Sequence, residues 1–127
     1  MKGNPGVLWI KIAVVYFVVG VCFGMYMAAS HDHSLFPVHA HINLLGWVSM
    51  ALIGLIYLKF PRAANSALQR GQFWLHNLGL PISMVSLTLL LRGNQALEPI
   101  VAVSSAAMAL GVILFAINVF RNIGERE

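Results

Sequence analysis

Long apolar runs separated by short polar stretches dominate this sequence. A helix that crosses about 30 Å of hydrocarbon needs about 20 mostly apolar residues. Four runs have that length, at about 7–29, 37–58, 73–91 and 99–120. The stretches between them hold Gly, Pro, Asn and charged residues, which are typical of turns. The pattern therefore predicts four membrane-spanning helices within one domain, residues 1–127.

The expected fold class is an all-α integral membrane four-helix bundle. Backbone polar groups must be satisfied internally in lipid, and the runs lack the alternation of tilted barrel strands. Gly20 and Gly24 form a GxxxG pair, extended one turn on by Ala28, which we interpret as a helix-packing face. The first span is too long for a signal peptide, so we expect it to be retained.

The composition excludes the soluble classes. Hydrophobic residues make up 59% of the chain and charged residues 9%, with a mean hydropathy of +0.80. A soluble domain of this size cannot bury so much apolar surface. Cys22 is the single cysteine, which rules out a disulfide scaffold. The net charge of +4 is too small and scattered for nucleic-acid binding, so the expected partner is the lipid bilayer.

The basic residues predict the orientation of the spans. Seven of the eight fall on one side of the predicted bundle, namely Lys2, Lys11, Lys59, Arg62, Arg70, Arg121 and Arg126, and Arg92 alone falls on the other. Cytoplasmic loops carry the excess of positive charge. Both termini are therefore predicted to be cytoplasmic, and the stretch holding His31 and His33 to face the periplasm or the cell exterior.

His39 and His41 are the strongest candidates for a functional site. They follow Pro37, which suits a first helical turn, so both should lie at membrane depth near the outer face. Each could be an interfacial histidine bonded to a backbone carbonyl or to water, but ionisable side chains inside a membrane mark functional sites by default. Residues two apart on a helix point about 200° apart, so each imidazole needs its own partner. Haem iron, copper and zinc all accept histidine, and the pair alone does not choose among them.

The other histidines are weaker candidates. His31 and His33 flank Asp32 in the outer connection, where they could bind copper or zinc or form a solvated loop. His76 is expected one turn into the third span, near the cytoplasmic end, as a structural or cofactor-supporting residue that does not share a ligand with His39 and His41. Gly79, Ser83 and Ser86 form a small-residue face of that span, suited to a close neighbour or a flat cofactor.

Other signals restrict the chemistry. Trp47 is the aromatic residue best placed to contact a haem. No hydrolase triad, phosphate-binding loop or carboxylate pair at membrane depth occurs in the sequence. The inner half offers only His76 as an ionisable group, which argues against a proton-coupled transporter.

The run HAHINLLGWVSMALIGLIY, residues 39–57, resembles the tenth helix of the catalytic subunit of haem–copper oxidases. The cytochrome cbb type is most similar, and the segment FWLHNLGLP, residues 73–81, is similar to its eleventh helix. The resemblance implies that His39 ligates a high-spin haem and His41 a low-spin haem. It also implies a bacterial cytoplasmic membrane, with the haems toward the outer side.

The chain departs from that family in size. The family subunit has twelve spans, copper ligands on other helices and a tyrosine cross-linked to one of those ligands, whereas four spans are predicted here. The chain alone is therefore not expected to be a complete cytochrome c oxidase. Because the family fold has approximate threefold symmetry, a homotrimer could reproduce the twelve-helix outline. Each cleft between protomers would then hold haem b between His41 of one copy and His39 of the next.

The leading functional hypothesis is a membrane protein that binds haem b, for electron transfer or for binding O₂ or NO. An electron-transfer partner or a gas ligand is then expected. One alternative is a copper-handling or oxidase-assembly protein that uses His31, His33 and His39. Another is an accessory subunit without haem that packs against a larger complex.

Overall fold

The computed structural model describes residues 3–125, and these contain helices and no strand. The elements are α1 (Pro5–Ser30), α2 (Phe36–His41), the π-helix η1 (Ile42–Val48), α3 (Ser49–Lys59), α4 (Pro61–Ala64), α5 (Ala67–Leu91), the 3₁₀-helix η2 (Gln95–Leu97) and α6 (Glu98–Asn122). Because α2, η1 and α3 are continuous, we refer to Phe36–Lys59 as the second span.

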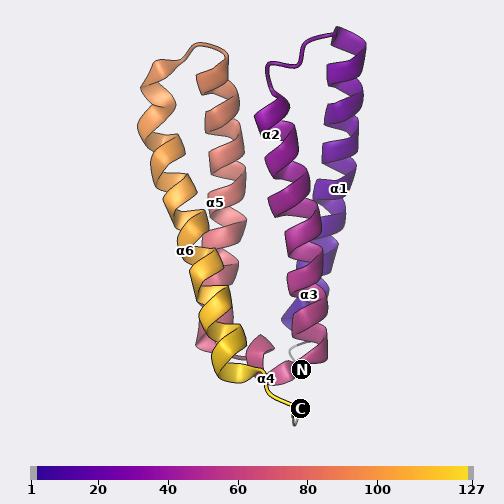
Figure 1. The fold of residues 1–127 in the computed structure, drawn as a ribbon, viewed down its shortest axis with the longest axis vertical. Helices are drawn as coiled ribbons and strands as arrows, with labels where there is room; N and C mark the ends of the chain where they lie inside the picture. Colours follow the sequence, from indigo (N-terminus) through magenta and orange to yellow (C-terminus); the bar gives the residue numbers. More distant parts are fainter. Residues whose placement is uncertain (1–2, 126–127) are drawn as a thin grey trace.

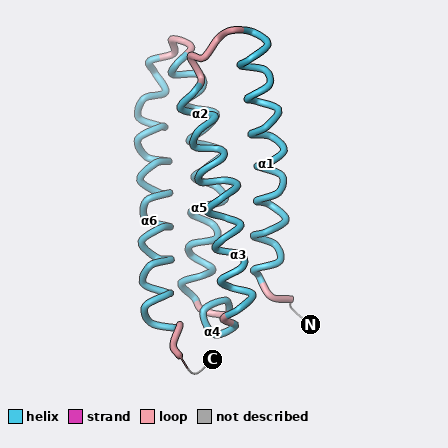
Figure 2. Tube along the Cα trace, turned by 45° about the vertical axis from the view of Figure 1, so that its right-hand side comes forward, coloured by secondary structure: helices cyan, strands magenta, loops and turns pink. Residues whose placement is uncertain are grey.

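Four helices are long and apolar enough to cross a membrane, namely Pro5–Ser30, Phe36–Lys59, Ala67–Leu91 and Gln95–Asn122. The predicted all-α fold with four candidate spans is thus confirmed. The helices form two hairpins that stand side by side, and both ends of the described chain lie at the same end as α4 (Figure 1). The second span and α5 occupy the middle, with α1 and α6 on the flanks (Figure 2).

The third span begins earlier than predicted. We expected residues 59–72 to form a link, but α4 lies within it and α5 starts at Ala67. Ser66 sets this start, because its hydroxyl accepts the backbone N–H of Gln69 over 3.1 Å. The first turns of α5 bury the polar side chains of Gln69 and Gln72. These two residues lower the mean hydropathy of the segment, so the apolar run begins later than the helix does. His76 consequently lies more than two turns inside the helix rather than one.

The second span contains a change of helix type that the sequence did not predict. Pro37 occupies the first turn of α2, as expected. The chain then widens into the π-helix Ile42–Val48 before α-helical geometry resumes at Ser49. π-Turns inside α-helices are rare, and those that occur are often found at functional sites. This segment of the second span is therefore a candidate for a functional role.

The GxxxG pair packs α1 against the second span, as interpreted from the sequence. Gly24 lies beside the ring of His39, and a Cβ atom at Gly24 would fall 2.9 Å from His39 Cε1. A Cβ atom at Gly20 would collide with the side-chain amide of Asn43. Real Cβ atoms essentially never come so close to a neighbour, so glycine lets the two helices approach and holds α1 against His39.

The small-residue face of α5 packs against α6. A Cβ atom at Gly79 would lie 3.1 Å from Met108 Cγ and 3.2 Å from the Ser104 carbonyl oxygen. One turn further, Ser83 Oγ and Ser105 Oγ are 3.1 Å apart. From the sequence we considered two roles for this face, contact with a close neighbouring helix or with a flat cofactor. The structure shows contact with a close neighbouring helix, α6.

Polar side chains join the two hairpins. The Tyr57 hydroxyl donates a hydrogen bond to Gln72 Oε1, and Asn118 Nδ2 donates to Tyr57 over 3.2 Å and to the Ala63 carbonyl over 3.0 Å. Tyr57, Gln72 and Asn118 are fully buried. Toward the other end, Leu35, Val38 and Ile42 form an apolar cluster with Leu80, Met84 and Met108.

The two ends of the bundle differ in the charged residues and histidines that they carry. Lys59, Arg62, Arg70 and Arg121 lie at the α4 end, which we call the basic end. The opposite end, which we call the histidine end, carries His31, His33, His39 and His41. Arg92 also lies there, with its guanidinium 3.8 Å from the Asp32 carboxylate. Lys2 and Arg126 fall outside the described residues.

Candidate functional site

His39 and His41 diverge, as their spacing predicts. His39 faces α1, where its ring stacks on Phe23 at a centroid distance of 6.2 Å and an interplanar angle of 15°. His41 is exposed and lines a groove of about 260 Å³ between the second span and the α5–α6 hairpin. The two rings therefore lie in separate environments on opposite sides of one helix.

The hydrogen bond of His41 leaves one nitrogen ready for a metal. Its Nδ1 lies 2.6 Å from the Pro37 carbonyl oxygen. A carbonyl oxygen only accepts, so Nδ1 carries the proton and Nε2 keeps its lone pair in the neutral ring. Metal-binding histidines show this arrangement, with one nitrogen held by a carbonyl and the other free for the ion. The Nε2 atom of His41 is thus the ring nitrogen available to a metal ion.

The surroundings of His39 favour the opposite tautomer. Asn43 Nδ2 donates to the His39 carbonyl oxygen over 2.9 Å, and this contact fixes which end of the amide faces the histidine. The same Nδ2 lies 3.4 Å from His39 Nδ1. Because an amide N–H is a donor, Nδ1 accepts and Nε2 carries the proton. His39 can bind a metal through Nε2 only after the ring gives up this bond with Asn43.

The groove at His41 is too small to enclose a haem. Its lining is mostly apolar, with Leu45, Leu80 and Met84 among its members and the hydroxyls of Ser83 and Ser105 at one side. Pockets that enclose a drug-sized ligand measure about 300–1,000 Å³. A groove of about 260 Å³ lies below that range, so one copy of the chain does not enclose a haem there.

His76 connects the hairpins close to this groove. It is 1% exposed, and its Nε2 lies 2.9 Å from the carbonyl oxygen of Leu45, one turn beyond His41 in the π-helix. Its ring meets the Trp9 ring edge to face at 5.4 Å. Through this bond, His76 holds the backbone of the helix that carries His41, so we assign His76 a positioning role. The sequence placed His76 too near the basic end, because the start of α5 was predicted too late.

Three buried polar atoms beside His76 have no partner among the described residues. They are His76 Nδ1, Trp9 Nε1 and Gln72 Nε2. With His76 Nε2 donating to Leu45, Nδ1 is an acceptor, whereas the other two atoms are donors. The proximity of Trp9 and Gln72 to His76 was not predicted from the sequence, because only the fold brings these side chains together.

Trp47 lies on the α1 side of the second span. Its ring stacks on Phe17 at 4.5 Å and an interplanar angle of 30°. It thus shares a side with His39 and lies away from the His41 groove. If Trp47 contacts a haem, that haem lies on the His39 side.

His31 and His33 are exposed in the connection between α1 and α2, and they do not form a metal-binding cluster. His31 ends α1 in the left-handed conformation, with φ 54°. Between residues 3 and 125, no group of three or more His, Cys, Asp or Glu residues is placed to hold a metal ion. The carboxylate of Asp32 instead accepts the backbone N–H of Ser34 over 3.0 Å. That bond, aided by Arg92, holds the pKa of Asp32 below its usual value.

Comparison with protein-family models, curated proteins and solved structures finds no match to this chain.

Proposed function

We propose that this chain is a membrane haem protein that binds haem b through His41, in an assembly of several copies. The observation that carries the proposal is His41, which lines a mostly apolar groove and whose Nδ1 is held by the Pro37 carbonyl oxygen, so that Nε2 keeps its lone pair. The resemblance of residues 39–57 to the tenth helix of haem–copper oxidases agrees with this choice. Haem b supplies an iron that accepts and releases one electron or binds a diatomic gas.

The size of the groove supports an oligomer, and a homotrimer would match the threefold outline of the oxidase core. In that arrangement His39 of a neighbouring copy supplies the second axial nitrogen after its ring leaves Asn43. Two histidine ligands favour electron transfer, whereas an open position favours binding of O₂ or NO. The orientation proposed is both termini in the cytoplasm of a bacterium, with the histidine end at the outer face of its cytoplasmic membrane.

The absorption spectrum of the purified full chain tests the proposal. We expect a Soret band that shifts on reduction, that His41→Ala abolishes, and that the matched change His33→Ala in the exposed loop leaves in place. His39→Ala should retain the band and convert a six-coordinate, low-spin spectrum to a five-coordinate, high-spin one. A featureless spectrum, with copper that co-purifies and is lost in His31→Ala/His33→Ala, would establish the copper-handling alternative instead.

Molecular mass measured in mild detergent tests the assembly. Haem-loaded protein should have the mass of three chains, and His41→Ala should lower the stability of the oligomer if haem bridges the copies. A haem-loaded monomer would contradict the shared site while leaving His41 as a ligand.

A further inference from the structure

Three buried side chains meet between α1 and α5. Gln72 and His76 lie four residues apart on α5, where side chains are neighbours on one face with Cβ atoms about 5–6 Å apart. The Trp9 ring of α1 meets the His76 ring edge to face at a centroid distance of 5.4 Å. It also lies 6.3 Å from the Tyr57 ring, whose hydroxyl donates to Gln72. Trp9, Gln72 and His76 thus surround one small region of the protein interior.

The hydrogen bonds of the joint fix the orientation of the Gln72 amide. Asn118 Nδ2 donates to the Ala63 carbonyl oxygen, which identifies this atom as the nitrogen, and it also donates to the Tyr57 hydroxyl. Tyr57 therefore uses its own proton for Gln72 Oε1. The other end of that amide, Gln72 Nε2, is buried and has no partner within residues 3–125.

The unpaired atoms around this region are two donors and one acceptor. Gln72 Nε2 and Trp9 Nε1 carry protons, whereas His76 Nδ1 carries a lone pair because Nε2 donates to Leu45. All three atoms are buried, and Trp9, Gln72 and His76 are each at least 99% buried as residues. Unpaired polar groups are unfavourable in such surroundings. The region therefore requires an occupant that accepts two hydrogen bonds and donates one.

This combination excludes simple ions and fits a water molecule. A cation would face two N–H donors, and an anion would face the lone pair of His76 Nδ1. Water accepts two hydrogen bonds and donates two, and buried waters typically make about three. A water with hydrogen bonds of about 2.9 Å bridges atoms up to about 6 Å apart, which suits side chains one helical turn apart.

The His76 ring also has open space beside it. With Leu45 and Ser49 it lines a groove of about 300 Å³ that the second span, α5 and α6 bound. A molecule of liquid water takes about 30 Å³. Water can therefore approach the ring of His76 through this groove.

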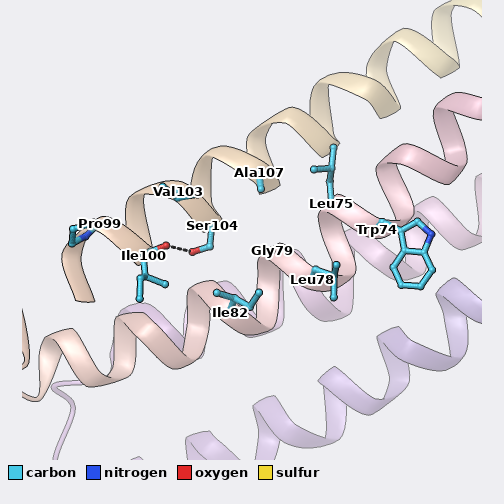
Figure 3. A pocket seen from close by; sticks show the side chains of 10 residues that line it. All are labelled: Trp74, Leu75, Leu78, Gly79, Ile82, Pro99, Ile100, Val103, Ser104 and Ala107. Carbon is cyan, nitrogen blue, oxygen red and sulfur yellow. Dashed lines mark hydrogen bonds between the residues drawn. The ribbon is translucent and has the colours of Figure 1, made fainter. Parts of the chain in front are cut away.

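A groove of about 530 Å³ between α5 and α6 differs from the region around His76. Its lining is almost wholly apolar, and the Ser104 hydroxyl within it donates to the Ile100 carbonyl oxygen over 2.7 Å (Figure 3). That surface suits hydrocarbon in general and selects no ligand. The unpaired atoms at His76 do select one, by their number and polarity.

We propose that Trp9, Gln72 and His76 bind one internal water molecule. The water accepts hydrogen bonds from Trp9 Nε1 and Gln72 Nε2 and donates one to His76 Nδ1. It thereby keeps His76 in the tautomer that donates to the Leu45 carbonyl oxygen, and so supports the π-helix. It also extends the polar joint of Tyr57 and Gln72 to α1. The site does not depend on haem.

NMR of the purified full chain in detergent micelles, with ¹⁵N in the Trp and Gln side chains, tests the proposal. We expect rotating-frame cross peaks to water from the Trp9 indole proton and from the Gln72 side-chain amide, with the sign of a dipolar contact rather than of proton exchange. Loss of each signal in Trp9→Phe and Gln72→Met assigns it. Absence of the water contact at either group, or a direct contact of the Gln72 amide with the His76 ring, would overturn the proposal.

Matched variants test whether the three groups share one water. Gln72→Met removes one donor and should weaken the contact of Trp9 with water several-fold. Gln69→Met changes another buried glutamine of α5 and should leave that contact in place. In the reverse direction, Trp9→Phe should weaken the contact of Gln72 with water, whereas Trp47→Phe should not. Equal effects of a site variant and its control would show general loosening of the fold and overturn the shared site.

Discussion

Asn118 Nδ2 donates a hydrogen bond to the Tyr57 hydroxyl, which joins residues 61 positions apart in the two hairpins. Tyr57 in turn donates to Gln72 Oε1, so one hydroxyl holds α3, α5 and α6 together. All three side chains are fully buried, where neither bulk water nor lipid can replace a missing partner. The joint between the hairpins is therefore polar and depends on few atoms.

Tyr57→Phe should lower the free energy of unfolding by about 1–2 kcal/mol, because it leaves the Gln72 oxygen without its donor and removes an acceptor from Asn118. Unfolding by SDS in mixed micelles measures this change. Tyr26→Phe, at an exposed position of α1, is the matched control and should change little. Equal effects of the two substitutions would show that the hydroxyl of Tyr57 contributes nothing to the joint.

His76→Leu should destabilise the fold by about 1–3 kcal/mol, since it removes the side-chain donor to the Leu45 carbonyl oxygen inside the π-helix. Because His76 positions the backbone near His41, the Soret band should persist in this variant with a changed maximum or intensity. Asn77→Leu, which removes a bond only to its own helix, should cost about 0.5 kcal/mol. Complete loss of haem in His76→Leu would instead indicate direct ligation by His76.

Asp32 should titrate below the usual range of an aspartate, because the Ser34 N–H and Arg92 favour its charged form. A carboxyl whose folded pKa is lowered stabilises the fold above its unfolded pKa, and this stabilisation is lost as pH falls through the folded pKa. NMR of the carboxyl carbon between about pH 2 and 6 follows the titration. Ser34→Pro, which removes the N–H, should raise the pKa of Asp32, whereas Ser34→Ala should raise it less. An unchanged pKa in Ser34→Pro would rule out the backbone bond as the cause.

The proposed orientation can be measured with single cysteines in a Cys22→Ser background. Asn94→Cys lies in the loop at the histidine end, and Ala67→Cys lies at the start of α5 at the basic end, both at exposed positions. An impermeant maleimide added to intact spheroplasts should label Asn94→Cys alone, and permeabilisation should then expose Ala67→Cys. The reverse labelling would place the basic end outside and contradict the positive-inside prediction.

The number and type of the spans could be predicted because span length depends only on local apolar composition. The divergence of His39 and His41 was also predictable, since helix geometry alone sets it. The start of α5 was not, because Gln69 and Gln72 are polar yet face the protein interior. The bond from His76 to Leu45, and the roles of Trp9 and Tyr57, depend on contacts between hairpins that periodicity does not encode.

The same separation into hairpins has a consequence for how the chain is made. Each hairpin consists of neighbours in sequence, so each can enter the membrane and close as it leaves the ribosome. The joint of Tyr57, Gln72 and Asn118 can form only after α6 is complete, since Asn118 lies in its last turns. We therefore expect the two halves to dock only after α6 has been made. Substitutions at the joint should yield inserted but undocked chains, which membrane quality-control proteases can recognise by their exposed polar groups.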